Sequence, residues 1–260
     1  TNLLGIFEFK SKFPMIKDNQ DFINYLEPKI SIRYNPSNMI DHSGTSRRIN
    51  NDNIFDINRL GLDDTLESGA SVTMGIDYKK ENLNNINNYF ELKLGTILRD
   101  KKNTNIPLTS GITEKHSNFY GQIRNNFNEN IALNYDFSID NSFNKIEYNS
   151  IGFEFAKNKF KTEINVIEEN GVIGDSNFIE NITSLILNEN NTLSFKTRQN
   201  RKLNIAEYYD LIYEYKNDCL VAGITYNKTY YEDRDLIPSE NLMFKLTLIP
   251  ITTIGQSVSN

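Results

Sequence analysis

The sequence contains no tryptophan, two histidines (His42 and His116) and one cysteine, Cys219. A single cysteine cannot form a disulfide bond within the chain, and no Cys/His spacing typical of a metal site is present. The HExxH, GxSxG and P-loop motifs of many enzymes are also absent. We therefore predict no catalytic residue, no metal site and no cofactor, and we expect that the chain is not an enzyme.

Long apolar runs and an excess of positive charge are missing as well. No run of about 18 apolar residues occurs, so no transmembrane helix is predicted. The net charge is −6 and no basic stripe exists, which argues against a nucleic-acid partner. The hydrophobic fraction of 38% is low for a soluble protein of 260 residues, but 16 Phe and 14 Tyr argue against disorder.

The sequence does contain apolar side chains at every second position. The segment GASVTMGIDYKK (69–80) shows the pattern, with Ala70, Val72, Met74, Ile76 and Tyr78 separated by polar or small residues. The segments 87–99, 130–140 and 240–250 repeat it. Such alternation predicts β-strands that have one apolar and one polar face.

We predict thirteen strands with the approximate bounds 3–13, 22–34, 67–80, 87–99, 115–125, 130–140, 146–157, 159–168, 177–187, 192–200, 204–216, 219–231 and 240–250. All thirteen have nine or more residues, which is about the length that a tilted membrane-spanning strand needs. Short turns alternate with longer connections, the longest being 35–66. These features are typical of an outer-membrane barrel, so the predicted fold is an all-β, antiparallel transmembrane β-barrel.

The alternation of connections also orients the strands. Outer-membrane barrels have short periplasmic turns and longer external loops, so the 35–66 connection is predicted to be external. The turn Lys216-Asn217-Asp218 then lies on the periplasmic side, with Cys219 at the rim and on the face of its strand that points to the lumen. Three roles for Cys219 stay open from the residues alone: a buried thiol, a nucleophile, or one half of a disulfide bond.

Several ordered segments resemble the outer-membrane LPS-assembly protein, the LptD family. They are YLEPKISIRYNP (25–36), IFDINRLGLDDTLESGASVTMGIDY (54–78), SGITEKHSNFYGQIRNNFNENIALNYDFSID (110–140), FNKIEYNSIGFEF (143–155) and YYDLIYEYKNDCLVAGITYNKTYYEDR (208–234). The likeness runs from about residue 25 to the end of the chain. It departs at Asp64, where the family often has Arg, and at Leu220, where some members carry a second, adjacent cysteine.

The resemblance implies a 26-stranded barrel with an N-terminal periplasmic jellyroll, located in the outer membrane. Such a barrel inserts lipopolysaccharide (LPS) into the outer leaflet through a lateral opening. The implied partners are LPS, a plug lipoprotein in the lumen, and a periplasmic bridge protein that delivers LPS to the N-terminal domain. The chain begins TNLLGIFEFK, without Met or a signal-peptide pattern, so we expect a piece of something longer or a processed product. The resemblance implies that residues 1–260 are the C-terminal half of the barrel, and the thirteen predicted strands agree with half of 26. The jellyroll and the first strands are then missing, and the C-terminus is periplasmic.

The resemblance also favours two candidate sites. It favours the disulfide role for Cys219, with a partner outside this chain. It further makes the predicted last strand one side of the lateral gate, with the residues Leu242, Phe244, Lys245, Leu246, Thr247, Leu248 and Pro250. Pro250 lacks an N–H group and cannot donate to a neighbouring strand, which would weaken the seam; equally, it could simply end the strand.

Other functions remain open at this point. The main alternative is a generic porin or receptor barrel with diffusion through an open lumen. A soluble β-sandwich is a further alternative, but thirteen strands with so little Leu and Val would have a poor core. An outer-membrane enzyme barrel would need catalytic residues that the sequence lacks.

Overall fold

The computed structural model describes residues 5–170, 177–230 and 239–248, together with the backbone of residues 252–259. Most of these residues form β-strands, and η1 (Leu108–Ser110) is the one helical element within these ranges. No helix of the described residues is long and apolar enough to cross a membrane. The chain divides into two compact units, which are described separately below. The first unit contains Thr1–Glu129, Leu133–Ile151 and Glu168–Asp175, and the second contains Asn130–Ala132, Gly152–Ile167 and Ser176–Asn260.

Fifteen strands occur in the described residues. Their bounds are β1 (Phe7–Lys12), β2 (Met15–Asp18), β3 (Phe22–Asn35), β4 (Gly69–Asn82), β5 (Tyr89–Arg99), β6 (Phe119–Asn128), β7 (Ile131–Ile139), β8 (Ile146–Lys157), β9 (Phe160–Glu169), β10 (Asn177–Asn188), β11 (Asn191–Asn200), β12 (Ile205–Lys216), β13 (Leu220–Thr229), β14 (Ser239–Leu248) and β15 (Thr252–Ser259). Each strand from β3 to β14 has 9 to 14 residues.

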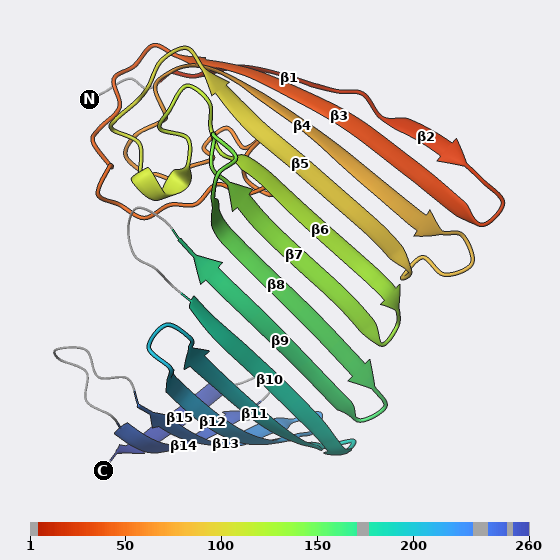
Figure 1. Ribbon diagram of the computed structural model, residues 1–260. Helices are drawn as coiled ribbons and strands as arrows, with labels where there is room; N and C mark the ends of the chain where they lie inside the picture. The colour runs from red at the N-terminus through yellow and green to blue at the C-terminus, as the bar shows by residue number, and fades with distance from the viewer. Residues whose placement is uncertain (1–4, 171–176, 231–238, 249–251, 260) are drawn as a thin grey trace. The chain divides into compact units, whose positions relative to one another are not determined.

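Hydrogen-bonded strands follow one another in chain order, from β1-β3-β4 to β13-β14-β15, with β2 also paired to β3 (Figure 1). The pairs are antiparallel, as for β3 with β4 and for β12 with β13. The all-β antiparallel class is therefore confirmed. The sheet is consistent with a partial β-barrel, but it is not closed within the described residues, because β1 pairs only with β3 and β15 only with β14.

The strands of the first unit have two faces of opposite character. The register places Phe9, Ile32 and Val72 in one cross-strand row. Phe9 is 63% exposed and Ile32 is 49% exposed, so this apolar face has no cover. The next row, on the opposite face, contains polar side chains such as Arg33 and Ser71, and these are buried. A soluble sheet would bury the apolar face instead.

The second unit repeats the apolar rows. Leu211 of β12 lies opposite Tyr226 of β13, which lies opposite Leu242 of β14. All three side chains are exposed, as is Phe244 two positions further along β14. The strand pattern read from the sequence thus places large apolar side chains on an uncovered face in both units.

The buried apolar core lies over the polar face of the first unit rather than over its apolar face. Two long connections supply most of it: residues 36–68 (the first connection) and residues 100–118 (the second connection). Its members are Met39, Ile49, Ile54, Leu60, Leu62, Ile97, Ile106, Ile112 and Tyr120. Figure 1 shows both connections gathered at one end of strands β3 to β6.

All thirteen predicted strands are present, but the count was too low. β2 was missed because its four residues, MIKD, are too few to show alternation. β15 was missed because TTIGQSVS places small polar residues where large apolar ones would mark a strand. The predicted strand 115–125 begins at Phe119 instead, because Ser117 and Asn118 bond to Ile97 and to Gly111 of the second connection.

A strand is present at the predicted range 240–250, but the prediction that it is the last strand is wrong. β14 ends at Leu248, and β15 pairs with it in antiparallel register, from Leu248 opposite Thr252 to Asn241 opposite Ser259. Pro250 lies outside the described residues. The proposed role of β14 at a lateral gate is a separate matter and stays a prediction.

Candidate functional site

The candidate site is the covered polar face of β3 to β6. Gly75 of β4 and Gly95 of β5 lie directly opposite each other on this face. A Cβ atom at Gly75 would lie 2.8 Å from the Phe55 ring and 2.9 Å from the Leu94 carbonyl oxygen, and one at Gly95 would lie 3.0 Å from Ile54. The two glycines therefore form a flat floor on which Ile54 and Phe55 of the first connection pack.

The two connections are bonded to each other above this floor. The His42 amide donates to the Asn105 carbonyl oxygen over 2.9 Å. The Thr109 hydroxyl oxygen lies 2.9 Å from both the amide nitrogen and the carbonyl oxygen of Arg47. These contacts join the first and second connections into one cover rather than two separate loops.

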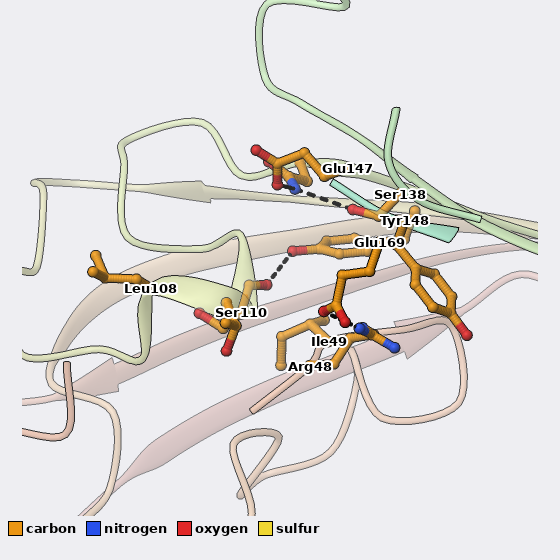
Figure 2. A pocket seen from close by; sticks show the side chains of 11 residues that line it. Arg48, Ile49, Leu108, Ser110, Ser138, Glu147, Tyr148 and Glu169 are labelled. Atoms are coloured by element: carbon orange, nitrogen blue, oxygen red, sulfur yellow. Dashed lines mark hydrogen bonds and ion pairs between the residues drawn. The ribbon is translucent and has the colours of Figure 1, made fainter. Parts of the chain in front are cut away.

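A small cavity remains between the cover and the strands (Figure 2). The Arg48 guanidinium pairs with Glu169 and lies 3.7 Å above the centre of the Tyr148 ring. The Tyr120 hydroxyl donates to the Ser110 carbonyl oxygen over 2.7 Å. The cavity measures about 20 Å³, which is room for about one water molecule and far too small for a lipid.

A cross-strand row supplies the cations of the site. The register aligns Arg33 of β3, Ser71 of β4 and Arg99 of β5, all on the polar face. Both arginines lie near the ends of their strands that enter or leave the long connections. Strand alternation thus brings two guanidinium groups to the underside of the cover, where they are buried.

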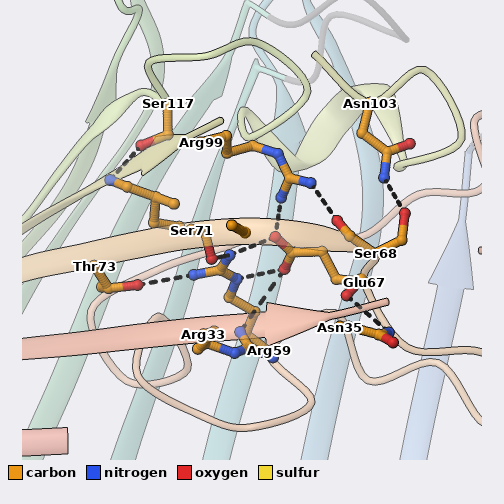
Figure 3. A network of polar contacts seen from close by, with 12 residues as sticks. Arg33, Asn35, Arg59, Glu67, Ser68, Ser71, Thr73, Arg99, Asn103 and Ser117 are labelled. Atoms are coloured by element: carbon orange, nitrogen blue, oxygen red, sulfur yellow. Dashed lines mark hydrogen bonds and ion pairs between the residues drawn. The ribbon is translucent and has the colours of Figure 1, made fainter. Parts of the chain in front are cut away.

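The carboxylate of Glu67 lies at the centre of these cations (Figure 3). Arg59 donates from Nε to Glu67 Oε2 over 2.6 Å and from Nη2 to Oε1, and Arg99 Nη1 also donates to Oε1. Arg33 Nη1 lies 3.8 Å from Glu67 Oε2. Arg59 and Glu67 are almost fully buried, with 0% and 5% of their side chains exposed. One carboxylate thus joins the first connection to strands β3 and β5.

Other donors of Arg59 and Arg99 bond to the sheet and to the connection. Arg59 Nη1 donates to the Thr73 hydroxyl over 2.9 Å, and its Nη2 also donates to Ser71 over 3.1 Å. Arg99 Nη2 donates to the Ser68 carbonyl oxygen over 2.7 Å. Buried ions are costly unless they are paired and hydrogen-bonded, and Glu67 supplies the anion that these guanidinium groups share.

The electrostatics of Glu67 agree with this role. Burial would raise the pKa of its carboxyl group, but the attraction of Arg59, Arg99 and Arg33, together with the hydrogen bonds from Arg59, outweighs burial. The pKa falls from 4.5 to about 2. Glu67 is therefore ionised at neutral pH and holds the three arginines together.

The polar face and its cover lie within the part of the chain that a known family matches. The sequence profile of LptD, described as LPS transport system D, matches residues 1–166. The chain belongs to the LptD family. This membership links the chain to LPS transport and assembly and to the outer membrane. No curated protein matches the chain.

The LptD match contains the cover, the glycine floor and the Glu67 network, but it ends before Cys219. Cys219 is exposed and lies just before β13, in the short turn after β12. The Asn217 side-chain oxygen accepts from the amides of Cys219 (3.0 Å) and Leu220 (2.8 Å), which sets the shape of the turn. The disulfide role of Cys219 stays a prediction.

Six of the seven predicted gate residues lie on β14, which belongs to the second unit, and the seventh, Pro250, lies outside the described residues. Leu242, Phe244, Leu246 and Leu248 are exposed on the apolar face of the second unit. Lys245 and Thr247 alternate with them, opposite Gly223 and Val221 of β13. The structure brings these residues together on one strand but does not test their role.

Sequence reasoning missed the Glu67 network of this LptD-family chain. One signal was available, because Asn58, Arg59, Gly61 and Asp63 lie in the segment 54–78 that resembles the family.

Asp64, where the sequence departs from the family pattern, contacts a histidine of the same connection. His42 Nε2 lies 2.9 Å from Asp64 Oδ1. His42 and Asp64 are 22 residues apart in the sequence, and the fold brings them together.

Proposed function

We propose that the chain forms part of an outer-membrane β-barrel that inserts LPS into the outer leaflet through an opening in the barrel wall. The observation that carries this proposal is the inverted distribution of side chains. The apolar rows are exposed in both units, whereas the polar face of the first unit is covered by its own connections. Such a sheet is stable only where lipid covers the apolar face.

The cover supports release through the wall rather than diffusion through the centre. A diffusion pore needs a water-filled lumen, yet the polar face of β3 to β6 is packed beneath the two connections. Exposing the acyl chains of LPS in a polar lumen would also cost free energy through the hydrophobic effect. Both difficulties are avoided if the acyl chains of LPS stay in the membrane. Only the polar part of LPS then passes along the lumen face of the barrel.

The lateral opening is proposed to lie beside β14 and β15. β15 has a single neighbour within the described residues, and open strand edges are where a barrel seam can part. β14 presents Leu242, Phe244, Leu246 and Leu248 to lipid and carries Lys245 and Thr247 on its other face. Lys245 would attract the phosphates of LPS as they pass the seam.

Two protein partners belong to the same proposal. In the second unit, Glu214 of β12 and Lys245 of β14 are exposed on the polar face, unlike the buried polar residues of the first unit. A plug lipoprotein in the lumen would cover such residues. A periplasmic bridge protein would deliver LPS to another part of the full-length protein.

The experiment is in-cell photocrosslinking of the full-length protein. A photoreactive phenylalanine derivative at Lys245 should form an LPS adduct during export. The same derivative at Thr73, which is buried beneath the cover, should form none. Export without any adduct at Lys245, or equal adducts at both positions, would contradict the proposed path.

A porin would behave differently in a second measurement. The full-length protein with its plug partner should show no steady ion conductance in a planar bilayer, because the cover fills the polar face. A large, constant conductance would favour the porin alternative.

A further inference from the structure

A groove lies beside β2 and β3, near the short turns of the first unit and away from the covered face. Its volume is about 420 Å³, and it is lined by Met15, Ile16, Lys17, Asn19, Asn24, Leu26 and Tyr78. Met15 and Ile16 are exposed, although both are large and apolar. The groove therefore combines apolar walls with several polar groups, as a site for an amphipathic ligand would.

The strand register shows how the polar and apolar parts are arranged. Met15, Leu26 and Tyr78 form one cross-strand row on the apolar face. Lys17, Asn24 and Lys80 form the next row on the same face, closer to the turns. The apolar rows of β2 to β4 therefore end in a row that carries two lysines and an amide.

These lysines are not neutralised by carboxylates. No acidic side chain lies in either row, and within the described residues no ion pair involves Lys17 or Lys80. The Lys80 ammonium instead lies 4.1 Å from the centre of the Phe22 ring. On the opposite face at the same level, Lys79 pairs with Glu81 over 2.6 Å. Near the short turns, positive charge is thus in excess on the apolar face and not on the opposite face.

We propose that this groove binds an anionic phospholipid. Its phosphate lies between the Lys17 and Lys80 ammonium groups and near the Tyr78 hydroxyl. In the structure this hydroxyl donates to Asn24 Oδ1 over 2.9 Å. Its acyl chains extend along Met15 and Leu26 toward the apolar rows. The proposal rests on the proposed function for the membrane placement of the sheet. Because short turns are periplasmic in outer-membrane barrels, the ligand is a lipid of the periplasmic leaflet rather than LPS.

The test uses the full-length protein reconstituted in lipid nanodiscs. Phosphatidylglycerol with a photoreactive acyl chain should crosslink to residues 13–26 in preference to a phosphatidylcholine probe with the same chain. Each lysine contributes about fivefold at a lipid surface, so Lys17→Gln should weaken this preference about fivefold and the double variant with Lys80→Gln further. Lys79→Gln, which changes the neighbouring residue on the opposite face, should leave it unchanged.

The outcomes separate this inference from the proposed function. Crosslinks along the exposed apolar rows without a phosphatidylglycerol preference at 13–26, or a preference that survives the double variant, would overturn the phospholipid site alone. Preferential capture of a photoreactive LPS probe at the same residues would overturn it too. An absence of acyl crosslinks on all apolar rows, including Phe244, would instead contradict the membrane placement and hence the proposed function.

Discussion

Arg59 and Glu67 lie eight residues apart in the first connection and face each other through two hydrogen bonds, with Nε 2.6 Å from Oε2. Both side chains are buried. The same carboxylate also accepts from Arg99 of β5, so the pair joins the connection to the sheet. One carboxylate therefore links the first connection to the sheet at this point.

Replacing Glu67 with Gln should loosen the cover. The substitution keeps the shape of the side chain but leaves three buried guanidinium groups without their shared anion, a change that costs about 3–5 kcal/mol in comparable buried pairs. We expect faster protease cleavage within residues 36–68 and a lower unfolding temperature for the full-length protein in detergent. The matched control is Glu114→Gln, because Glu114 pairs with Lys102 at an exposed position and should matter by less than about 1 kcal/mol. Equal behaviour of the two variants would show that the network does not hold the cover.

Acid should loosen the cover in the same way. The folded-state pKa of Glu67, about 2, is lower than its ordinary value of 4.5, so its stabilising effect is complete above pH 4.5. That effect is lost progressively as the pH falls from about 4.5 toward 2. Protease sensitivity of the first connection, measured with an acid-active protease, should rise over this range. Glu67→Gln should show a smaller pH response; an unchanged response in that variant would assign it to other groups.

Adding one methyl group at Gly75 should displace Phe55. The new Cβ would lie 2.8 Å from the Phe55 ring and 2.9 Å from a backbone oxygen, and the backbone cannot move aside easily. Overpacking of this kind costs about 1–3 kcal/mol. Gly223→Ala is a suitable control, because the nearest atom to a Cβ at Gly223 is 3.8 Å away. Thermal unfolding of the two variants should differ accordingly, and a Gly75→Ala variant as stable as Gly223→Ala would argue against the glycine floor.

Cys219 should be oxidised in the full-length protein. Its thiol is exposed, so a free thiol there would react readily with a maleimide. If Cys219 forms the predicted disulfide bond, labelling should require a reductant, and Cys219→Ser should change the mobility of the protein on a non-reducing gel. Rapid labelling of Cys219 without reductant would contradict the disulfide.

The strands were largely predictable because alternation is a local property of the sequence. In β4 and β12, apolar residues occupy every second position along most of the strand. Their predicted bounds agree with the structure within a few residues. The same pattern places the apolar side chains on one face, whereas their exposure was expected only from the interpretation as a barrel. β2 and β15 escaped prediction, because a four-residue strand and a strand of small polar residues show little alternation.

The Glu67 network could not be predicted in this way. Arg33 and Arg99 are ordinary polar-face residues of their strands, and only the register aligns them. Arg59 and Glu67 come from a connection without periodicity, so nothing local indicates that they meet or that they are buried. The packing of Ile54 and Phe55 on Gly75 and Gly95 has the same origin, since it depends on how a long connection folds back over the sheet.

The most direct test of the account follows newly made LPS in cells from which the full-length protein is depleted. Pulse-labelled LPS should stop reaching the cell surface as the protein disappears and should accumulate inside, and the wild-type protein supplied in trans should restore its arrival. Labelled LPS that reaches the surface at an unchanged rate after complete depletion would contradict the proposal that this chain belongs to an LPS-inserting barrel.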